Sequence, residues 1–181
     1  MAQLRTKRQT VTLKIAYGGL LIALGILLPQ AFHIFGQEAG MIFLPIQIPV
    51  FMAGLLLGPI YGGIVGAAVP ILSCVLTAMP PVPKVYFMLF EMVAYGVASG
   101  LLKKKFNVIV SILGAIIAGR LMYGAALAAG VSILGIHAPF ANSAAFISTL
   151  VTGIPGNLIQ LTLLPALYIG LKRGGFTFDE R

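Results

Sequence analysis

Six long apolar segments, separated by short stretches rich in glycine, proline or charge, dominate this sequence. They cover roughly residues 11–29, 44–57, 60–78, 85–102, 107–134 and 143–171. A helix needs about 20 apolar residues to cross the hydrocarbon core of a bilayer. The chain is 59% hydrophobic and only 9% charged, far from the composition of soluble domains. We therefore predict an all-α integral membrane bundle of six transmembrane helices, with one domain over residues 1–181.

The second and third apolar segments are the least regular of the six. Prolines interrupt them at Pro45, Pro49, Pro59 and Pro70. As a helix, residues 44–57 would reach only about 21 Å, short of the roughly 30 Å hydrocarbon core. We expect these segments to be short, tilted or broken. A four-span arrangement, in which the two form one re-entrant hairpin, stays open at this point.

Positive charges gather at three places along the chain. They precede the first segment, separate the fourth from the fifth, and follow the sixth: Arg5, Lys7, Arg8, Lys14; Lys103, Lys104, Lys105; Lys172 and Arg173. These places share one side of the membrane only if the number of spans is even. The positive-inside rule then puts the basic N-terminus (1–10) and the tail (174–181) in the cytoplasm.

The net charge of +8 is therefore explained by topology. Basic residues are not interleaved with exposed aromatic residues along one face, as nucleic-acid binding would require. We expect a multi-pass protein of the cytoplasmic membrane, surrounded by lipid, with no nucleic-acid partner.

Small residues recur at helical spacing in two places. Gly54, Gly58, Gly62 and Gly66 follow one another every four residues, which predicts close packing inside the molecule. In the first segment Ala16, Gly19 and Ala23 share one helical face. That face indicates either internal packing or a smooth docking surface for another membrane subunit, and spacing alone does not separate the two.

Two ionisable residues, Glu91 and Arg120, lie inside predicted spans. Such residues are costly to insert, so they are candidates for function by default. Helical rise places them about 10 Å and 22 Å from Lys84 and Lys105, close enough in depth to meet. Their pairing has two interpretations: a structural ion pair between two spans, or an arginine that binds an anionic ligand while the glutamate orients it.

Further polar side chains fall at similar depth. Each of three segments carries a pair at i, i+3 or i, i+4: Glu91 with Tyr95, Arg120 with Tyr123, and Asn157 with Gln160. We predict a small polar pocket between these segments.

The loops expected on the outer side add two elements to that pocket. The stretch 29–41 carries Phe32 and His33, a mixture suited to a lid. Lys84 marks the outer end of the fourth segment and is a candidate contact for an anionic ligand at the mouth.

No known catalytic or metal-binding motif is present. The sequence has no phosphate-binding G-x-x-x-x-G-K-[ST] loop, no G-x-S-x-G and no H-E-x-x-H. We predict no catalytic residues, no cofactor and no metal site. Two alternatives remain: a stand-alone membrane enzyme using Glu91 or His137 in acid/base chemistry, and a structural membrane protein with a Glu91–Arg120 ion pair.

Four stretches of the sequence resemble one family, the substrate-binding S components of energy-coupling factor (ECF) vitamin transporters. They cover nearly all of the chain in order: "FLPIQIPVFMAGLLLGPIYGGIVGAAVPILSCVLTAMPPVP" (43–83), "FEMVAYGVASGLL" (90–102), "AGRLMYG" (118–124) and "TGIPGNLIQLTLLP" (152–165). The first is the most specific. Their pattern is similar to that of one subfamily, whose ligands are pantothenate or pyrimidine precursors.

The resemblance implies a six-helix bundle with a ligand pocket near the outer face, capped by the loops after helices one and three. It also implies partners, namely a transmembrane T component and two cytosolic ATPase subunits that drive uptake. Docking through small residues of helix one falls on Ala16, Gly19 and Ala23, where glycine replaces part of the family's repeated alanines. The substrate expected is pantothenate, with a hydroxymethylpyrimidine or pyridoxine-type precursor as the alternative, because Arg120 favours a carboxylate.

Overall fold

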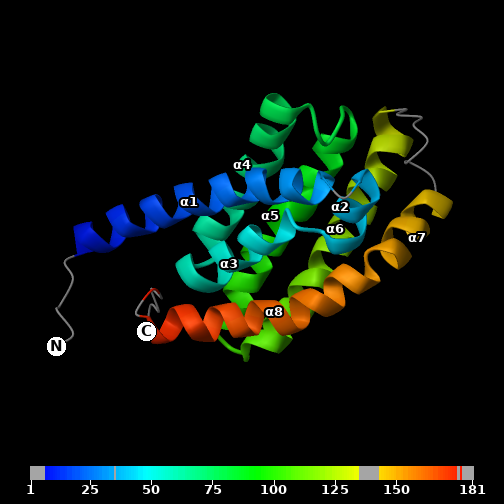
Figure 1. The fold of residues 1–181 in the computed structure, drawn as a ribbon. Coiled ribbons are helices and arrows are strands. Elements are labelled where there is room, and N and C mark those ends of the chain that lie inside the picture. Colours follow the sequence, from blue (N-terminus) through cyan, green and yellow to red (C-terminus); the bar gives the residue numbers. More distant parts are fainter. Residues whose placement is uncertain (1–6, 35, 135–142, 175, 177–181) are drawn as a thin grey trace.

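The computed structural model describes residues 7–34, 36–134, 143–174 and 176, and these residues form an all-α bundle (Figure 1). Within these ranges no strand is present. The helices follow one another as α1 (Lys7–His33), α2 (Gln37–Phe43), α3 (Gln47–Leu57), α4 (Pro59–Thr77), α5 (Lys84–Lys103), α6 (Val108–Leu134), α7 (Ser143–Thr152) and α8 (Ile154–Arg173).

Six stretches of the described chain are long and apolar enough to cross a membrane, which confirms the predicted architecture. Four of them are single helices, α1, α4, α5 and α6. The other two, Gly40–Leu57 and Ala144–Arg173, join α2 to α3 and α7 to α8. The alternative with four spans and a re-entrant hairpin is not needed, because α4 by itself, with 19 residues, is long enough to cross the membrane.

The second span is broken, as the prolines predicted. Leu44 ends α2 in the left-handed conformation, with φ 53° and ψ 45°, and its N–H donates to the carbonyl of Gly40. Pro45 follows and has no N–H to continue the helix. The chain then turns so that the N–H of Gln47 donates to the Leu44 carbonyl at 3.1 Å, and α3 begins.

Three boundaries differ from the sequence prediction. The helix α1 runs through Pro29 to His33, and α2 begins at Gln37, so most of the expected outer loop 29–41 is helical. Pro70 lies inside an unbroken α4. The sixth segment, expected to be one helix, divides at Gly153 into α7 and α8, because Pro155 has no N–H to continue α7 and is suited to the first turn of a new helix.

The core is centred on α3, which lies between α1 and α8 and against α4 and α5 (Figure 1). Ten of its eleven residues are buried. Glycines permit this close approach: a Cβ on Gly62 would lie 2.7 Å from the Cα of Gly54 and 2.7 Å from the carbonyl carbon of Gly96. The interpretation of the glycine repeat as internal packing is therefore confirmed for Gly54, Gly62 and Gly66, whereas Gly58 has nothing within 4 Å of a built Cβ and instead ends α3 with φ 98°.

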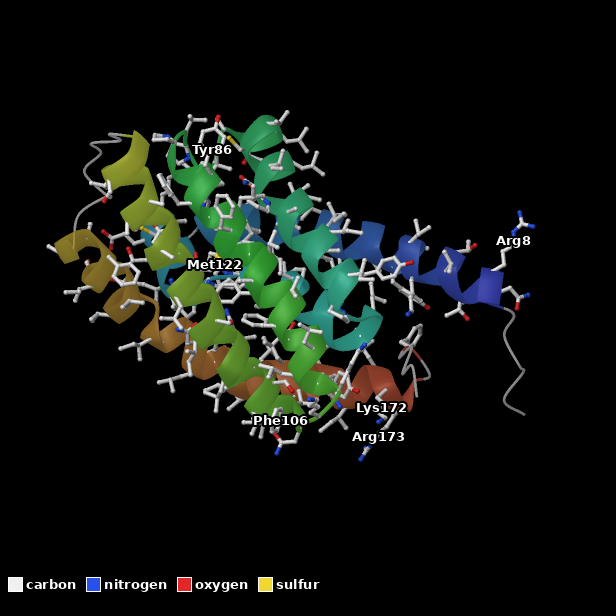
Figure 2. All side chains as sticks on the ribbon, turned by 180° about the vertical axis from the view of Figure 1, so that it is seen from behind. Arg8, Tyr86, Phe106, Met122, Lys172 and Arg173 are labelled. Carbon is white, nitrogen blue, oxygen red and sulfur yellow. The ribbon has the colours of Figure 1, made fainter. Side chains whose placement is uncertain are left out.

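The start of α1 and the end of α8 lie at the same end of the bundle (Figure 1). Tyr17 and Phe176 meet there edge to face, with ring centroids 5.8 Å apart. Arg8, Lys172 and Arg173 project from this end, away from Tyr86 at the other (Figure 2). The six apolar spans make the chain a multi-pass membrane protein. The positive-inside rule predicts that this basic end lies in the cytoplasm.

The outer surface of the bundle is strongly apolar. Large side chains stand exposed on several helices, among them Ile60, Val75, Leu121 and Met122 (Figure 2). In water such a surface would be unfavourable, whereas in a bilayer it faces lipid chains of the same polarity.

Candidate ligand-binding site

A cavity of about 470 Å³ lies near the outer end of the bundle, where α5 begins. All of the helices except α8 contribute to its wall, together with the loop between α4 and α5. The lining comprises Pro29, Gln30, His33, Gly40, Met41, Leu44, Pro45, Ile46, Gln47, Ser73, Met79, Pro80, Pro81, Lys84, Met88, Glu91, Met92, Arg120, Tyr123, Ser148, Thr149 and Thr152. Its size is in the range of small-molecule sites.

Glu91 and Arg120 meet in this wall, as the sequence predicted. Nη1 of Arg120 lies 2.9 Å from Oε1 of Glu91, and both side chains are buried. The same Oε1 accepts a 2.6 Å hydrogen bond from the hydroxyl of Tyr95. Two donors on one carboxylate oxygen compensate for part of the cost of burying the charge.

Tyr95 lies behind Glu91 and not in the wall of the cavity. Its ring is fully buried and packs against Phe51, with centroids 4.9 Å apart. The side chain of Gln47 also forms a hydrogen bond with Tyr95. Gln47, Tyr95, Glu91 and Arg120 therefore form one connected polar network that joins α3, α5 and α6.

Arg120 uses only part of its hydrogen-bonding capacity. Nη1 binds Glu91, whereas Nε and Nη2 are buried and have no hydrogen-bond partner. In a guanidinium group Nε–H and one Nη–H point in parallel from one edge, the geometry that matches a carboxylate. Arg120 is thus a cation with part of its donor set still unpaired.

The α7–α8 break leaves space beside that arginine. A Cβ on Gly153 would lie 2.9 Å from Nη2 of Arg120 and 3.1 Å from Cδ1 of Leu44. Glycine at this position therefore lets the guanidinium and the Leu44 side chain both lie against the α7–α8 break. The carboxyl end of α7 is also the negative end of its helix dipole.

The lining has an excess of positive charge. Its formally charged residues are Lys84, Arg120 and Glu91, two positive and one negative, which leaves +1 with His33 neutral. Since Glu91 is already bound to Arg120, the cavity favours a ligand with a negative charge.

The structure brings five of the nine predicted binding residues into the cavity wall: His33, Lys84, Glu91, Arg120 and Tyr123. The other four lie elsewhere. Tyr95 is behind Glu91. The ring of Phe32 packs against that of Phe43, with ring centroids 5.5 Å apart. Asn157 and Gln160 lie on α8, which supplies no lining residue.

Gln160 instead supports the broken second span. Its Nε2 donates a 3.2 Å hydrogen bond to the carbonyl of Leu44, and the side chain is completely buried. Nearby, a Cβ on Gly156 would lie 2.9 Å from the carbonyl carbon of Phe43. The polar face of α8 therefore holds the end of α2 in place. The depth of Gln160 in the membrane did not predict this contact, because depth does not determine whether a helix face points toward the cavity or toward a neighbouring helix.

Sequence reasoning missed several polar lining residues. They are Gln30, Gln47, Ser73, Ser148, Thr149 and Thr152. Gln47 could have been found, since it is a polar residue inside a predicted span, the signal that identified Glu91. Thr149 and Thr152 were placed within the sixth segment but belong to α7, a separate helix over the cavity.

The predicted docking face on α1 is open. Ala16, Gly19 and Ala23 are exposed, and nothing lies within 4 Å of a Cβ built on Gly19. The opposite side of α1 carries the internal contacts: a Cβ on Gly25 would lie 2.7 Å from Val69 of α4. Among the described residues this face makes no close internal contact, which favours the docking interpretation over internal packing.

Side chains that could bind a metal ion together are scarce in the described residues. These residues contain no group of three or more His, Cys, Asp or Glu side chains that could hold a metal ion. His137, the alternative candidate for acid/base chemistry, lies outside the part of the chain that the structure describes.

Fold and cavity together define a polytopic helical membrane protein with a ligand-sized chamber, whose mostly apolar wall carries a few polar and charged groups. The family model of the ECF transporter substrate-specific component matches residues 13–171, and the chain belongs to this family. It is thus a substrate-binding subunit of an ECF transporter and not an enzyme. Comparison with curated proteins found no match, and comparison with solved structures found none either.

Proposed function

We propose that this subunit captures a water-soluble vitamin or vitamin precursor at the outer face, with pantothenate as the leading candidate. Binding is of high affinity and takes place in the cavity between α5, α6 and α7. The pocket is small enough to enclose one vitamin-sized molecule and has both apolar and polar walls.

The observation that carries this proposal is Arg120, buried beside the cavity with Nε and Nη2 unpaired. An unpaired buried guanidinium donor is costly unless a ligand satisfies it. A carboxylate does so with two parallel hydrogen bonds and also offsets the positive charge of the lining. Pantothenate carries one carboxylate. A hydroxymethylpyrimidine or pyridoxine-type precursor is the alternative, and it would leave that charge in place.

The remainder of the wall suits the uncharged part of such a ligand. Met41, Met79, Met88 and Met92 line the cavity. Methionine side chains are flexible and polarizable, so they adapt to an aliphatic chain. Hydroxyl groups on α7 and α4 add hydrogen-bonding capacity to the wall.

Uptake requires partners, and we infer a transmembrane T component and two cytosolic ATPase subunits. The sequence has no phosphate-binding loop of its own. The exposed face formed by Ala16, Gly19 and Ala23 supports docking along α1, because small residues let two membrane helices approach closely.

A second role for the ion pair is structural, in which Glu91 and Arg120 only hold α5 against α6. The buried 2.9 Å contact favours that role as well, and the two roles are compatible. If the pair contacts the ligand, a variant that lacks it and still folds loses ligand binding. If the pair is only structural, such a variant still binds the ligand.

The test starts with mass spectrometry of small molecules released from the purified chain. Wild type, Glu91→Gln and Arg120→Ala are then titrated with pantothenate, a hydroxymethylpyrimidine and pyridoxine by calorimetry. We expect pantothenate to bind wild type. Its affinity should fall at least about 100-fold in Arg120→Ala, because the variant loses a charge-assisted bidentate contact with the carboxylate. Equal affinity of folded Arg120→Ala and wild type would overturn the assignment of the site. Co-purification with ATPase subunits tests the partners.

A further inference from the structure

Gln47 is the most buried uncharged polar group in the cavity wall that the proposed function does not use. Gln47 is the first residue of α3, directly after the break in the second span. Only 2% of its surface is exposed. Its Oε1 has no hydrogen-bond partner. A buried acceptor without a partner costs about 1–3 kcal/mol, so it calls for an explanation.

The neighbouring network determines which end of the amide is unpaired. The hydroxyl of Tyr95 gives its single proton to Oε1 of Glu91, at 2.6 Å. Gln47 forms its hydrogen bond with the same tyrosine. The tyrosine oxygen can then only accept from Gln47, so the amide presents Nε2 to Tyr95 and keeps Oε1 free.

The acceptor oxygen of Gln47 thus complements the unpaired donors of Arg120 in the wall of the same cavity. Arg120 keeps Nε–H and Nη2–H, which require an acceptor, and Gln47 keeps Oε1, which requires a donor. The Gln47–Tyr95–Glu91–Arg120 network connects the two groups. It therefore holds the Gln47 amide and the Arg120 guanidinium in fixed positions relative to each other.

We infer that the ligand is a carboxylate that also carries an N–H or O–H donor, and that Oε1 of Gln47 accepts a hydrogen bond from that donor while Arg120 binds the carboxylate. Gln47 is then a specificity-determining residue. This inference rests on the proposed function, since it names the class of ligand for the same site.

Such a pair of groups discriminates more sharply than a hydrophobic wall. A site built to hydrogen-bond a ligand rejects an analogue that lacks the matching group, because the buried acceptor is left unpaired. The effect of one neutral hydrogen bond is about 10- to 100-fold in affinity.

The test uses purified full-length chain in detergent and matched ligands. The ligands are pantothenate, panthenol (the carboxylate replaced by an alcohol), pantothenate methylated on its amide nitrogen, and pantothenate without its hydroxyl groups. Wild type is expected to prefer pantothenate over panthenol by at least about 100-fold and over at least one donor-deleted analogue by about 10-fold.

The variant Gln47→Leu isolates the role of the amide. It is expected to bind pantothenate and the discriminated donor-deleted analogue with nearly equal affinity, while it keeps the preference over panthenol. Gln160→Leu is the matched control, since Gln160 is equally buried, also has an unpaired Oε1, and lies outside the cavity wall. It is expected to lower stability and to leave the affinity ratios unchanged.

The outcomes separate this inference from the proposed function. Binding of pantothenate with no preference over either donor-deleted analogue, or a preference that persists in Gln47→Leu, overturns the role of Gln47 and leaves the proposed function standing. Equal binding of panthenol overturns the carboxylate contact. If wild type binds none of the four ligands, the pantothenate assignment fails and this inference fails with it. The wild-type comparison decides whether the site requires a ligand donor. If Gln47→Leu does not fold, Gln47→Met, which keeps the length of the side chain and lacks the acceptor oxygen, takes its place in the test of Gln47.

Discussion

Arg120 contacts Glu91 through a single guanidinium nitrogen, with Nη1 2.9 Å from Oε1. The contact joins α5 to α6 inside the membrane and leaves the rest of the arginine unpaired. One residue therefore serves the packing of two spans and remains able to bind a ligand.

Removal of one member of this pair leaves the other charge buried and uncompensated. Arg120→Leu alone is expected to lower the free energy of unfolding by about 3–5 kcal/mol, whereas the double variant Glu91→Leu/Arg120→Leu recovers most of that loss. Thermal unfolding in detergent measures both. A double variant no more stable than Arg120→Leu would show that the two side chains do not depend on each other.

Close packing of α4 and α5 depends on glycine. A Cβ on Gly96 would lie 3.0 Å from the Cα of Gly62, so Gly96→Ala is expected to destabilise the bundle by about 1–3 kcal/mol through overpacking. Gly19→Ala is the control, because nothing lies within 4 Å of its added methyl group. The melting temperature of Gly96→Ala should fall while that of Gly19→Ala stays at the wild-type value.

Gly153 provides space beside the unpaired nitrogen of Arg120. The methyl group of Gly153→Ala would meet Nη2 at 2.9 Å and displace the guanidinium from its place beside the cavity. Ligand affinity is expected to fall about 10-fold, the effect of one displaced hydrogen bond. Gly170→Ala on the same helix has nothing within 4 Å and should bind as wild type does. Titration calorimetry compares the two, and equal affinities would argue against this role.

The open face of α1 predicts a variant that separates partner binding from ligand binding. Ala16→Leu should reduce co-purification with the T component and the ATPase subunits by blocking close helix approach, with ligand affinity unchanged. Ala125→Leu, at an exposed position on α6, is the control for added bulk at the lipid surface. Normal assembly of Ala16→Leu would place the docking surface elsewhere.

Topology can be tested by labelling. Cys74 is the chain's single cysteine, so a Cys74→Ala background is free of thiols. In intact cells a membrane-impermeant maleimide should label Val82→Cys, 63% exposed in the α4–α5 loop, and should not label Lys104→Cys until the membrane is opened. The opposite labelling pattern would show that the bundle has the reverse orientation in the membrane.

The number of spans followed from the sequence, and the side of the termini is predicted from it. Both are properties of single segments and their flanking charges, and the solvent alone decides them. The meeting of Glu91 with Arg120 was also predicted, because two isolated ionisable residues at similar depth have few alternatives to pairing in a membrane.

The sequence did not predict where the helices break or which polar face turns to the cavity. Gly153 divides the last span, and Gln160 bonds to the Leu44 carbonyl and not to a ligand cavity, because two distant segments meet there. The sequence by itself determined the membrane location, the number of spans and the ionisable pair. Only the tertiary structure decided that Gln47 and α7 line the cavity with Arg120, since the rotation of each helix depends on the neighbours against which it packs.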